Sequence, residues 1–250
     1  MTILITGGTK GIGLAIAEHL APRGEPLVLG WHADAQAADA AVARLGPLAR
    51  AVRADVGDPA DCARLVREAG ELGDGELGGG APLHIVHSAA AIYPTTLLGA
   101  DLPAFEAAIR TNGLSLLYLV QAARPWLARG SSIVFVTSAG ARQALPNYAA
   151  LGCGKALAES LIRYLVPELA PLGVRINAVA PGLVATTSVA RMAGSQDAAE
   201  RALDRGARAN PSGRLTEGAD YAAVVDFLLG DGGRFVQGQV IHANGGAWVG

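Results

Sequence analysis

The feature that most constrains this chain is the run from Ile3 to Gly13, ILITGGTKGIG, close to its amino terminus. A short apolar stretch predicts a buried strand, a glycine-rich turn follows, and the apolar residues after Gly13 continue as a helix. Backbone N–H groups at a helix N-terminus bind anions, and glycines keep side chains out of their way. The order strand, turn, helix therefore predicts a pyrophosphate site, against the alternative of a purely structural glycine turn.

Apolar strand-like runs alternate with helical patterns along the rest of the chain. This alternation implies crossover connections and a parallel sheet. We expect an α/β fold of the Rossmann type: a doubly wound, seven-stranded parallel sheet with helices on both faces, in a single domain over residues 1–250. The expected strands are Thr2–Thr6, Pro26–Gly30, Ala49–Arg53, Leu83–His87, Ser132–Thr137, Arg175–Ala180 and Val240–Ala243, and the expected helices are 11–21, 34–45, 58–72, 101–128, 147–170 and 217–229.

Composition excludes several classes of function. A hydrophobic fraction of 51% with 5% aromatic residues fits a large aliphatic core, as in a sheet that is buried on both faces. A net charge of −2 gives no reason to expect nucleic acid or an anionic membrane as partner. Cys62 and Cys153 lack metal or redox spacing. With the first strand at residue 3 and no long apolar run, we expect a cytoplasmic protein that holds no metal.

Three stretches stand apart from this regular pattern. The glycine-rich segment 73–82 predicts a surface loop. Residues 186–214, with a short helical pattern near 196–209, follow the sixth strand at its carboxyl end, where open sheets bind ligands, and predict a substrate lid. Pro167 falls inside the expected helix 147–170, which must either kink there or end earlier.

The end of the second strand predicts which dinucleotide would bind. An acidic residue often stands there to hold a ribose 2′-hydroxyl, but this chain has Gly30 and Trp31, and we expect Asp34 to cap the next helix. Lys10 in the glycine turn and His32 nearby suit a 2′-phosphate instead, which favours NADPH; a solvated Lys10 without cofactor preference, and hence NADH, stays an alternative.

Taken together, the motifs resemble those of the short-chain dehydrogenase/reductase family along essentially the whole chain. The His87-Ser88 pair departs from the usual Asn-Asn, and Asn244 stands where Asp is usual. The resemblance implies a homotetramer, with helices 101–128 and 147–170 paired across a two-fold axis. The matching residues are Thr6 to Gly13, Asp55-Val56, Ser88-Ala89-Ala90, Asn112, Ser138, Lys155, Pro181-Gly182 and the C-terminal run Gly238 to Gly246.

One departure affects catalysis directly. The family's usual tyrosine, four residues before the lysine, is replaced by Leu151, which can donate no proton. Tyr148 stands seven residues before Lys155, and on a helix the two would share a face. This Tyr-x6-Lys spacing, with Pro146-Asn147 before the tyrosine, resembles the enoyl-acyl-carrier-protein reductase branch of the family.

The candidate site follows from these observations and from the resemblance. Tyr148 would hydrogen-bond the substrate oxygen, Lys155 would hold the nicotinamide ribose, Ser138 would assist or orient the substrate, and Asn112 would fix a helix irregularity or a water. Asp55 and Val56 would meet the adenine edge, and Pro181, Gly182, Val184 and Thr186 the carboxamide. The candidate cofactor-binding residues are Gly7, Thr9, Lys10, Gly11, Ile12, Gly13, His32, Asp55, Val56, Ser88, Ala89, Ala90, Lys155, Pro181, Gly182, Val184 and Thr186.

Three functions fit this pattern. The first is NADPH-dependent reduction of a 2-enoyl thioester, carried by an acyl carrier protein, in fatty-acid or polyketide synthesis. The second is a ketoreductase with a displaced catalytic tyrosine. The third is a non-catalytic NAD(P)-binding protein. Moving the tyrosine three residues upstream displaces it by about 4.5 Å along a helix, a shift of the right order to follow the oxygen of an enoyl thioester.

Overall fold

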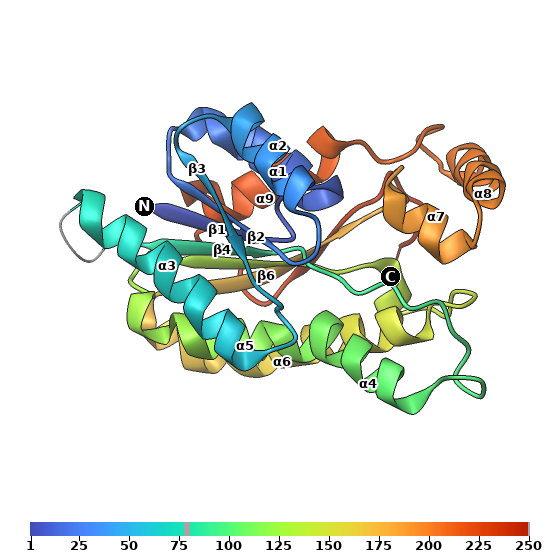
Figure 1. The fold of residues 1–250 in the computed structure, drawn as a ribbon, viewed down its shortest axis with the longest axis horizontal. Coiled ribbons are helices and arrows are strands. Elements are labelled where there is room, and N and C mark those ends of the chain that lie inside the picture. Colours follow the sequence, from blue (N-terminus) through green and yellow to red (C-terminus); the bar gives the residue numbers. More distant parts are fainter. Residues whose placement is uncertain (78–80, 250) are drawn as a thin grey trace.

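The computed structural model describes residues 1–77 and 81–249, which fold around one parallel sheet (Figure 1). Its seven strands run in the order β3-β2-β1-β4-β5-β6-β7, so the chain starts near the middle of the sheet and winds outward in both directions. This confirms the expected Rossmann-type fold. The strands are β1 (Thr2–Thr6), β2 (Leu27–Trp31), β3 (Ala49–Arg53), β4 (Leu83–His87), β5 (Ser132–Val136), β6 (Arg175–Pro181) and β7 (Val240–Ala243).

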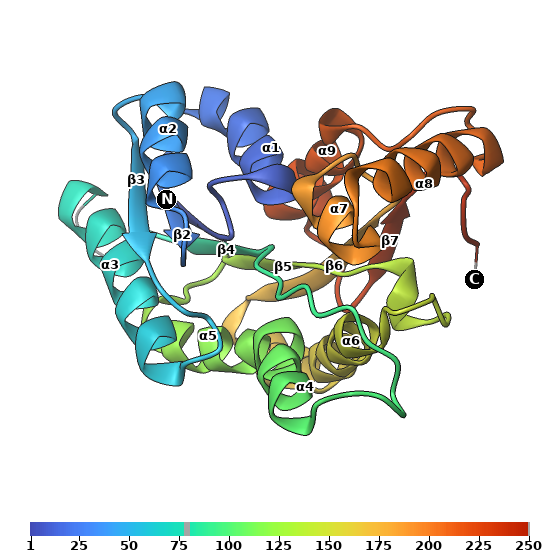
Figure 2. The same cartoon turned by 45° about the vertical axis from the view of Figure 1, so that its right-hand side comes forward.

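Helices cover both faces of the sheet (Figure 2). Successive strand residues point to opposite faces, so Ile3 and Ile5 of β1 enter one core cluster and Leu4 enters the other. The Ile3 side is covered by α1 (Gly11–Leu20), α2 (Ala35–Leu45) and α9 (Gly218–Leu229). The Leu4 side is covered by α3 (Pro59–Leu77), α5 (Ser115–Ala123) and α6 (Ala149–Leu169).

The expected helix 101–128 is not continuous. Helix α4 (Leu102–Ile109) leads into a π-helical segment, Arg110–Leu114, and α5 and a short 3₁₀ turn (Arg124–Trp126) follow. The π-helical segment presses on α6, since a Cβ added to Gly154 would lie 2.5 Å from the Asn112 Cβ. Packing between two glycine-containing surfaces thus overrides the regular helical pattern that the sequence predicts.

Two further helix boundaries differ from expectation. Helix α6 begins at Ala149 and continues through Pro167 to Leu169, so the proline does not end it. Helix α3 extends to Leu77, so the segment expected as a loop over 73–82 begins as helix, and its residues 78–80 lie outside the described part of the chain.

The segment expected as a lid contains two helices after β6, α7 (Thr187–Ala193) and α8 (Gln196–Ala209). The bounds of α8 match the predicted pattern. Figure 2 shows both helices beyond the carboxyl ends of the strands, above the loops that follow β4 and β5. In the residues that the structure describes, no helix is both long and apolar enough to cross a membrane.

The contact between α6 and the π-helical segment yields a stability prediction. Alanine is favoured over glycine in a helix by about 1 kcal/mol, but a methyl group at Gly154 would overlap the Asn112 side chain. We expect Gly154→Ala to lower the free energy of unfolding by about 1 to 3 kcal/mol. Urea denaturation measures this, with Cys153→Ala on the exposed side of the same helix as control. A Gly154→Ala variant as stable as the control would contradict the packing described.

Candidate active site

The glycine turn forms an open cradle at the start of α1. Gly7 has a φ of +64°, and a Cβ there would lie 2.9 Å from the Cα of Ala89. Gly11 has a φ of +55° and borders open space, with Thr186 the nearest group at 3.6 Å from an added Cβ. No side chain caps α1. Uncapped N–H groups beside the glycines of this turn fit a dinucleotide pyrophosphate.

Other residues in and after the turn have structural roles. A Cβ on Gly13 would lie 2.2 Å from the Gly7 carbonyl oxygen, so only glycine fits there. The side chain of Thr9 is buried, whereas Ile12 is partly buried and packs against the cluster of core residues around β1. The turn therefore offers a ligand mainly backbone groups.

Lys10 has a carboxylate partner, which was not expected from the sequence. The Lys10 Nζ lies 3.0 Å from Asp34 Oδ2. Asp34 also caps α2 as expected, since its Oδ1 accepts a hydrogen bond from the Ala37 N–H at 3.1 Å. These two contacts lower the pKa of the Asp34 carboxyl, the backbone hydrogen bond more than the lysine. Because half of the Lys10 side chain is exposed, a 2′-phosphate can still compete for it.

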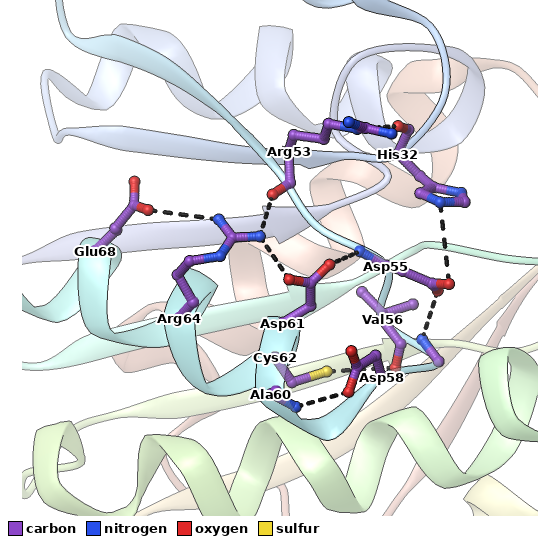
Figure 3. Close-up of polar contacts among 11 residues, drawn as sticks. His32, Arg53, Asp55, Val56, Asp58, Ala60, Asp61, Cys62, Arg64 and Glu68 are labelled. Carbon is purple, nitrogen blue, oxygen red and sulfur yellow. Dashed lines mark hydrogen bonds and ion pairs between the residues drawn. The ribbon is translucent and has the colours of Figure 1, made fainter.

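The residues expected at the adenine edge meet where β2 and β3 end (Figure 3). The His32 Nε2 lies 3.9 Å from Asp55 Oδ2, and the Arg53 Nε donates to the His32 carbonyl at 3.1 Å. The backbone two residues further on orients the Asp55 carboxylate, because its Oδ1 accepts from the Gly57 N–H at 2.8 Å. Val56 is buried beside them. The structure therefore brings His32, expected near the 2′-phosphate, next to Asp55 and Val56, expected at the adenine edge.

Two side chains, those of Thr6 and Asn112, hold the backbone of the loop that follows β4. The Ala89 N–H donates to Thr6 Oγ1 at 3.2 Å, and the side-chain amide of Asn112 both donates to and accepts from the backbone of Ala91, each at 2.9 Å. Asn112 is fully buried within the π-helical segment. Asn112 thus lies in a helix irregularity, as expected, and its amide anchors Ala91 at the far end of the segment Ser88, Ala89 and Ala90.

Lys155 is a buried cation with no carboxylate partner among the contacts of the described residues. Its Nζ donates to the Val136 carbonyl at 2.7 Å and lies 4.4 Å from the centre of the Phe135 ring. Burial lowers the pKa of the ammonium group from 10.5 to about 7. An anionic or polyhydroxyl ligand at the end of β5 would stabilise this charge.

Tyr148 does not lie on α6 with Lys155, as the sequence pattern predicts, but is the residue immediately before the helix. Its hydroxyl nevertheless reaches Ser138, with Oη 3.1 Å from Ser138 Oγ. The displacement along a helix therefore does not describe the position of the phenol. Leu151, at the family's usual tyrosine position, is 5% exposed and belongs to the buried core.

Sequence reasoning missed the residues that hold Tyr148. Its ring covers Gly140, where an added Cβ would lie 2.5 Å from the ring Cε1. The preceding residue, Asn147, has a φ of +57°, and its carbonyl accepts from the Thr95 N–H at 3.1 Å. Asparagine tolerates this left-handed backbone better than most residues, and that preference was the available signal.

The residues expected near the carboxamide lie at the end of β6. Pro181 is the last residue of the strand, and a Cβ on Gly182 would overlap Thr216 Oγ1 at 2.3 Å. Val184 packs on the core, and Thr186 precedes α7 and faces Gly11 of the turn. The structure therefore places the end of β6 opposite the glycine turn, across the carboxyl edge of the sheet (Figure 2).

Comparisons with known proteins agree with this geometry. Residues 7–247 match a family model described as "Enoyl-(Acyl carrier protein) reductase". An Arabidopsis thaliana protein named "NADPH-dependent aldehyde reductase-like protein, chloroplastic" is 31% identical over 97% of this chain and 92% of its own length. A Streptomyces collinus "1-cyclohexenylcarbonyl-CoA reductase" is 33% identical over 97% of this chain and 85% of its own length.

Solved structures lead to the same family. A short-chain dehydrogenase from Burkholderia cenocepacia in complex with NADP superposes with a TM-score of 0.85 at 28% identity, covering 98% of this chain and 96% of its own. The fold and the site define a nicotinamide-dependent oxidoreductase. The chain belongs to the short-chain dehydrogenase/reductase family, within the group that the matching model describes.

The buried ammonium of Lys155 predicts how stability depends on pH. The folded pKa of about 7 lies below 10.5, so the folded state binds fewer protons between these values and its stability falls as the pH is lowered toward 7. Lys155→Met removes this cost. We expect the free energy of unfolding of the variant, minus that of the native protein, to be about 2 kcal/mol higher at pH 7 than at pH 9. Urea denaturation at the two pH values measures this difference. A difference between the two proteins that stays constant over this pH range would contradict the buried charge.

Proposed function

We propose that this protein is an NADPH-dependent reductase of 2-enoyl thioesters. The observation that carries the proposal is the hydroxyl pair of Tyr148, just before α6, and Ser138, after β5, in a chain with leucine at the usual tyrosine position 151. The glycine turn before the uncapped start of α1 supports the dinucleotide, and the half-exposed Lys10 supports its 2′-phosphate. The relatives named for NADPH and the structure solved with NADP support the same choice of cofactor.

The chemistry that bound NADPH supplies is a hydride for the β-carbon of the enoyl group. The double-bond electrons then move toward the thioester oxygen, and a proton from solvent at the α-carbon completes the saturated thioester, with NADP⁺ as the oxidised product. The protein must hold the thioester oxygen while negative charge develops there. A preorganised O–H donor stabilises such charge by about 3 kcal/mol.

The hydrogen bonds of Ser138 show which donor is available to a substrate. Ser138 Oγ accepts from the Gly140 N–H at 3.1 Å and from the Tyr148 hydroxyl, which uses both of its lone pairs. The proton of Ser138 therefore has no partner within the pair. A substrate oxygen beside the two residues would receive this proton directly, or that of Tyr148 if the bond between them reverses.

The titration of Tyr148 favours stabilisation of charge over transfer of a proton. Burial raises the pKa of the Tyr148 phenol, and the hydrogen bond to Ser138 lowers it by less. A phenol with a raised pKa stays protonated at neutral pH and gives up its proton reluctantly. That suits a donor to an enolate oxygen, whereas a ketone must acquire a full proton on the oxygen.

A second candidate is reduction of a carbonyl group, as in a ketoreductase. It is favoured by the relatives named as aldehyde reductases, two of which come from Arabidopsis thaliana. The same Tyr148–Ser138 pair would then donate a proton to the carbonyl oxygen next to the carbon that receives the hydride. Substrate trials separate the two reactions.

The enoyl and carbonyl reactions predict different outcomes with matched substrates. We expect NADPH consumption with crotonyl thioesters and little with acetoacetyl thioesters or aldehydes, and we expect Tyr148→Phe to lower kcat by about 100-fold. Tyr164→Phe is the control, because Tyr164 lies on α6, the helix that follows Tyr148, and is 74% exposed. Turnover of acetoacetyl thioesters or aldehydes alone would overturn the enoyl proposal, and an unchanged rate in Tyr148→Phe would remove that residue from the mechanism.

We further propose that the acyl group arrives on an acidic carrier protein, as part of fatty-acid or polyketide synthesis. The lid segment 186–214 carries five arginines and three carboxylates in a chain of net charge −2. Arg201, Arg205 and Arg208 lie at helical spacing on one exposed face of α8, which also carries Asp197 and Asp204, and no ion pair joins these arginines to another described residue. Their position on the lid suits an acidic partner at the mouth of the site.

Charge reversal on the lid tests the carrier. We expect Arg201→Glu/Arg205→Glu to raise KM for crotonyl carrier protein by about tenfold or more, because like charges at the rim oppose docking. The same variant should leave KM for a small neutral crotonyl thioester unchanged. Equal effects on both substrates, or none on either, would contradict a carrier that docks on α8.

The homotetramer implied by the family also belongs to this proposal. Tyr164 of α6, Phe227 of α9 and Phe235 before β7 are 74%, 45% and 99% exposed, respectively. Large exposed aromatic side chains are typical of surfaces that another subunit covers. These three residues support assembly through α6 and through the β7 edge.

A further inference from the structure

A buried chain of hydrogen bonds joins the strand of the glycine turn to the π-helical segment. Thr6 Oγ1 lies 2.6 Å from His87 Nδ1, and His87 Nε2 lies 2.6 Å from Ser115 Oγ. Thr6, His87 and Ser115 are all 0% exposed. His87 occupies one of the two positions at which the sequence departs from the usual Asn-Asn pair, and none of the roles described so far uses it.

The donor and acceptor of each hydrogen bond in this series follow from the groups at its two ends. Ser115 Oγ donates its proton to the Thr111 carbonyl at 2.7 Å, so toward His87 it can act only as acceptor. His87 therefore carries its proton on Nε2, and its Nδ1 accepts the proton of Thr6. Thr6 Oγ1 in turn accepts a hydrogen bond from the Ala89 N–H at 3.2 Å.

The surroundings keep this imidazole neutral. A second proton, on Nδ1, would leave the Thr6 hydroxyl without an acceptor in a site that water does not reach. The Phe135 ring lies 5.4 Å from the His87 ring, and the Lys155 ammonium lies 4.4 Å from the same Phe135 ring. Burial, and after it the charge of Lys155, lowers the pKa of His87 to about 3.

We propose that His87 is a positioning residue of the dinucleotide site, held as the neutral Nε2–H tautomer, which sets the spacing between the glycine turn and the π-helical segment. At one end the chain fixes Thr6, which holds Ala89; at the other it fixes Thr111, next to the Asn112 amide that holds Ala91. His87 thereby controls both anchors of the loop 88–91 without touching the cofactor. The inference rests on the dinucleotide-binding part of the proposed function.

The first test reads the imidazole itself. Long-range ¹H–¹⁵N spectra of histidine-labelled protein distinguish the two tautomers, and the spectrum of His87→Phe assigns the signal among the five histidines. We expect the Nε2–H tautomer, unchanged between about pH 5.5 and pH 8.5. A proton on Nδ1, or a titration within this range, would overturn the proposal. This readout needs neither cofactor nor substrate.

The second test measures NADPH affinity by fluorescence titration. We expect His87→Phe and Ser115→Ala each to weaken binding about tenfold with a smaller change in kcat, because each leaves a buried partner unsatisfied. The double variant should be no weaker than the single ones, since both act through one chain of bonds. If His87→Phe does not fold, Ser115→Ala carries the comparison.

The control is a second buried histidine on the same strand. His84 lies at the other end of β4, is 1% exposed, and accepts from the Ser132 N–H at 3.0 Å. We expect His84→Phe to lower Tm without changing the Kd for NADPH. An unchanged Kd in both His87→Phe and Ser115→Ala, or an equal weakening in His84→Phe, would reduce His87 to a structural role. Failure of the native protein to bind NADPH would instead overturn the proposed function and leave the tautomer result standing.

Discussion

The site depends on how closely the chain approaches itself where β1 and β4 end. These strands pair in parallel with Thr6 opposite His87, so the glycine turn and the loop after β4 leave the sheet side by side. A Cβ on Gly7 would lie 2.9 Å from the Ala89 Cα, which means that backbone touches backbone there. Parallel pairing places the strand ends at one edge, and small residues let them converge on a ligand.

The converging strand ends surround a charge that the protein alone does not neutralise. The contacts of the Lys155 ammonium are a carbonyl oxygen and the face of Phe135, and both are weaker partners than a carboxylate. Such a charge costs stability in the free protein. Under the proposed function, the oxygens of a bound dinucleotide beside Lys155 would recover this cost, which would account for a buried lysine at this position.

The sequence predicts the parts of the structure that local chemistry determines. The parallel strands, the glycine turn and the bounds of α8 follow from apolar runs, glycines and helical periodicity, which act within a few residues. The resemblance implied a helix irregularity at Asn112, but its π-helical form could not be predicted, because the segment packs on α6 through Asn112 and Gly154, more than forty residues apart. The contact between Lys10 and Asp34 was not predicted for a related reason. Asp34 was expected only as a helix cap, but a carboxylate has two oxygens, and the second one binds the lysine.

Tyr148 shows how a three-residue shift changes what controls a side chain. A tyrosine at position 151 would be held by the body of α6, whereas Tyr148 stands before the helix, and its position depends on loops. Asn147 adopts a left-handed backbone fixed by Thr95 of the β4–α4 loop, and Gly140 of the loop after β5 lies under the ring. These two loops lie below the lid at the carboxyl edge of the sheet (Figure 2). If Tyr148 is the donor that we propose, a substrate that moves either loop also moves the Tyr148 hydroxyl, and substrate selection is then coupled to the placement of the donor.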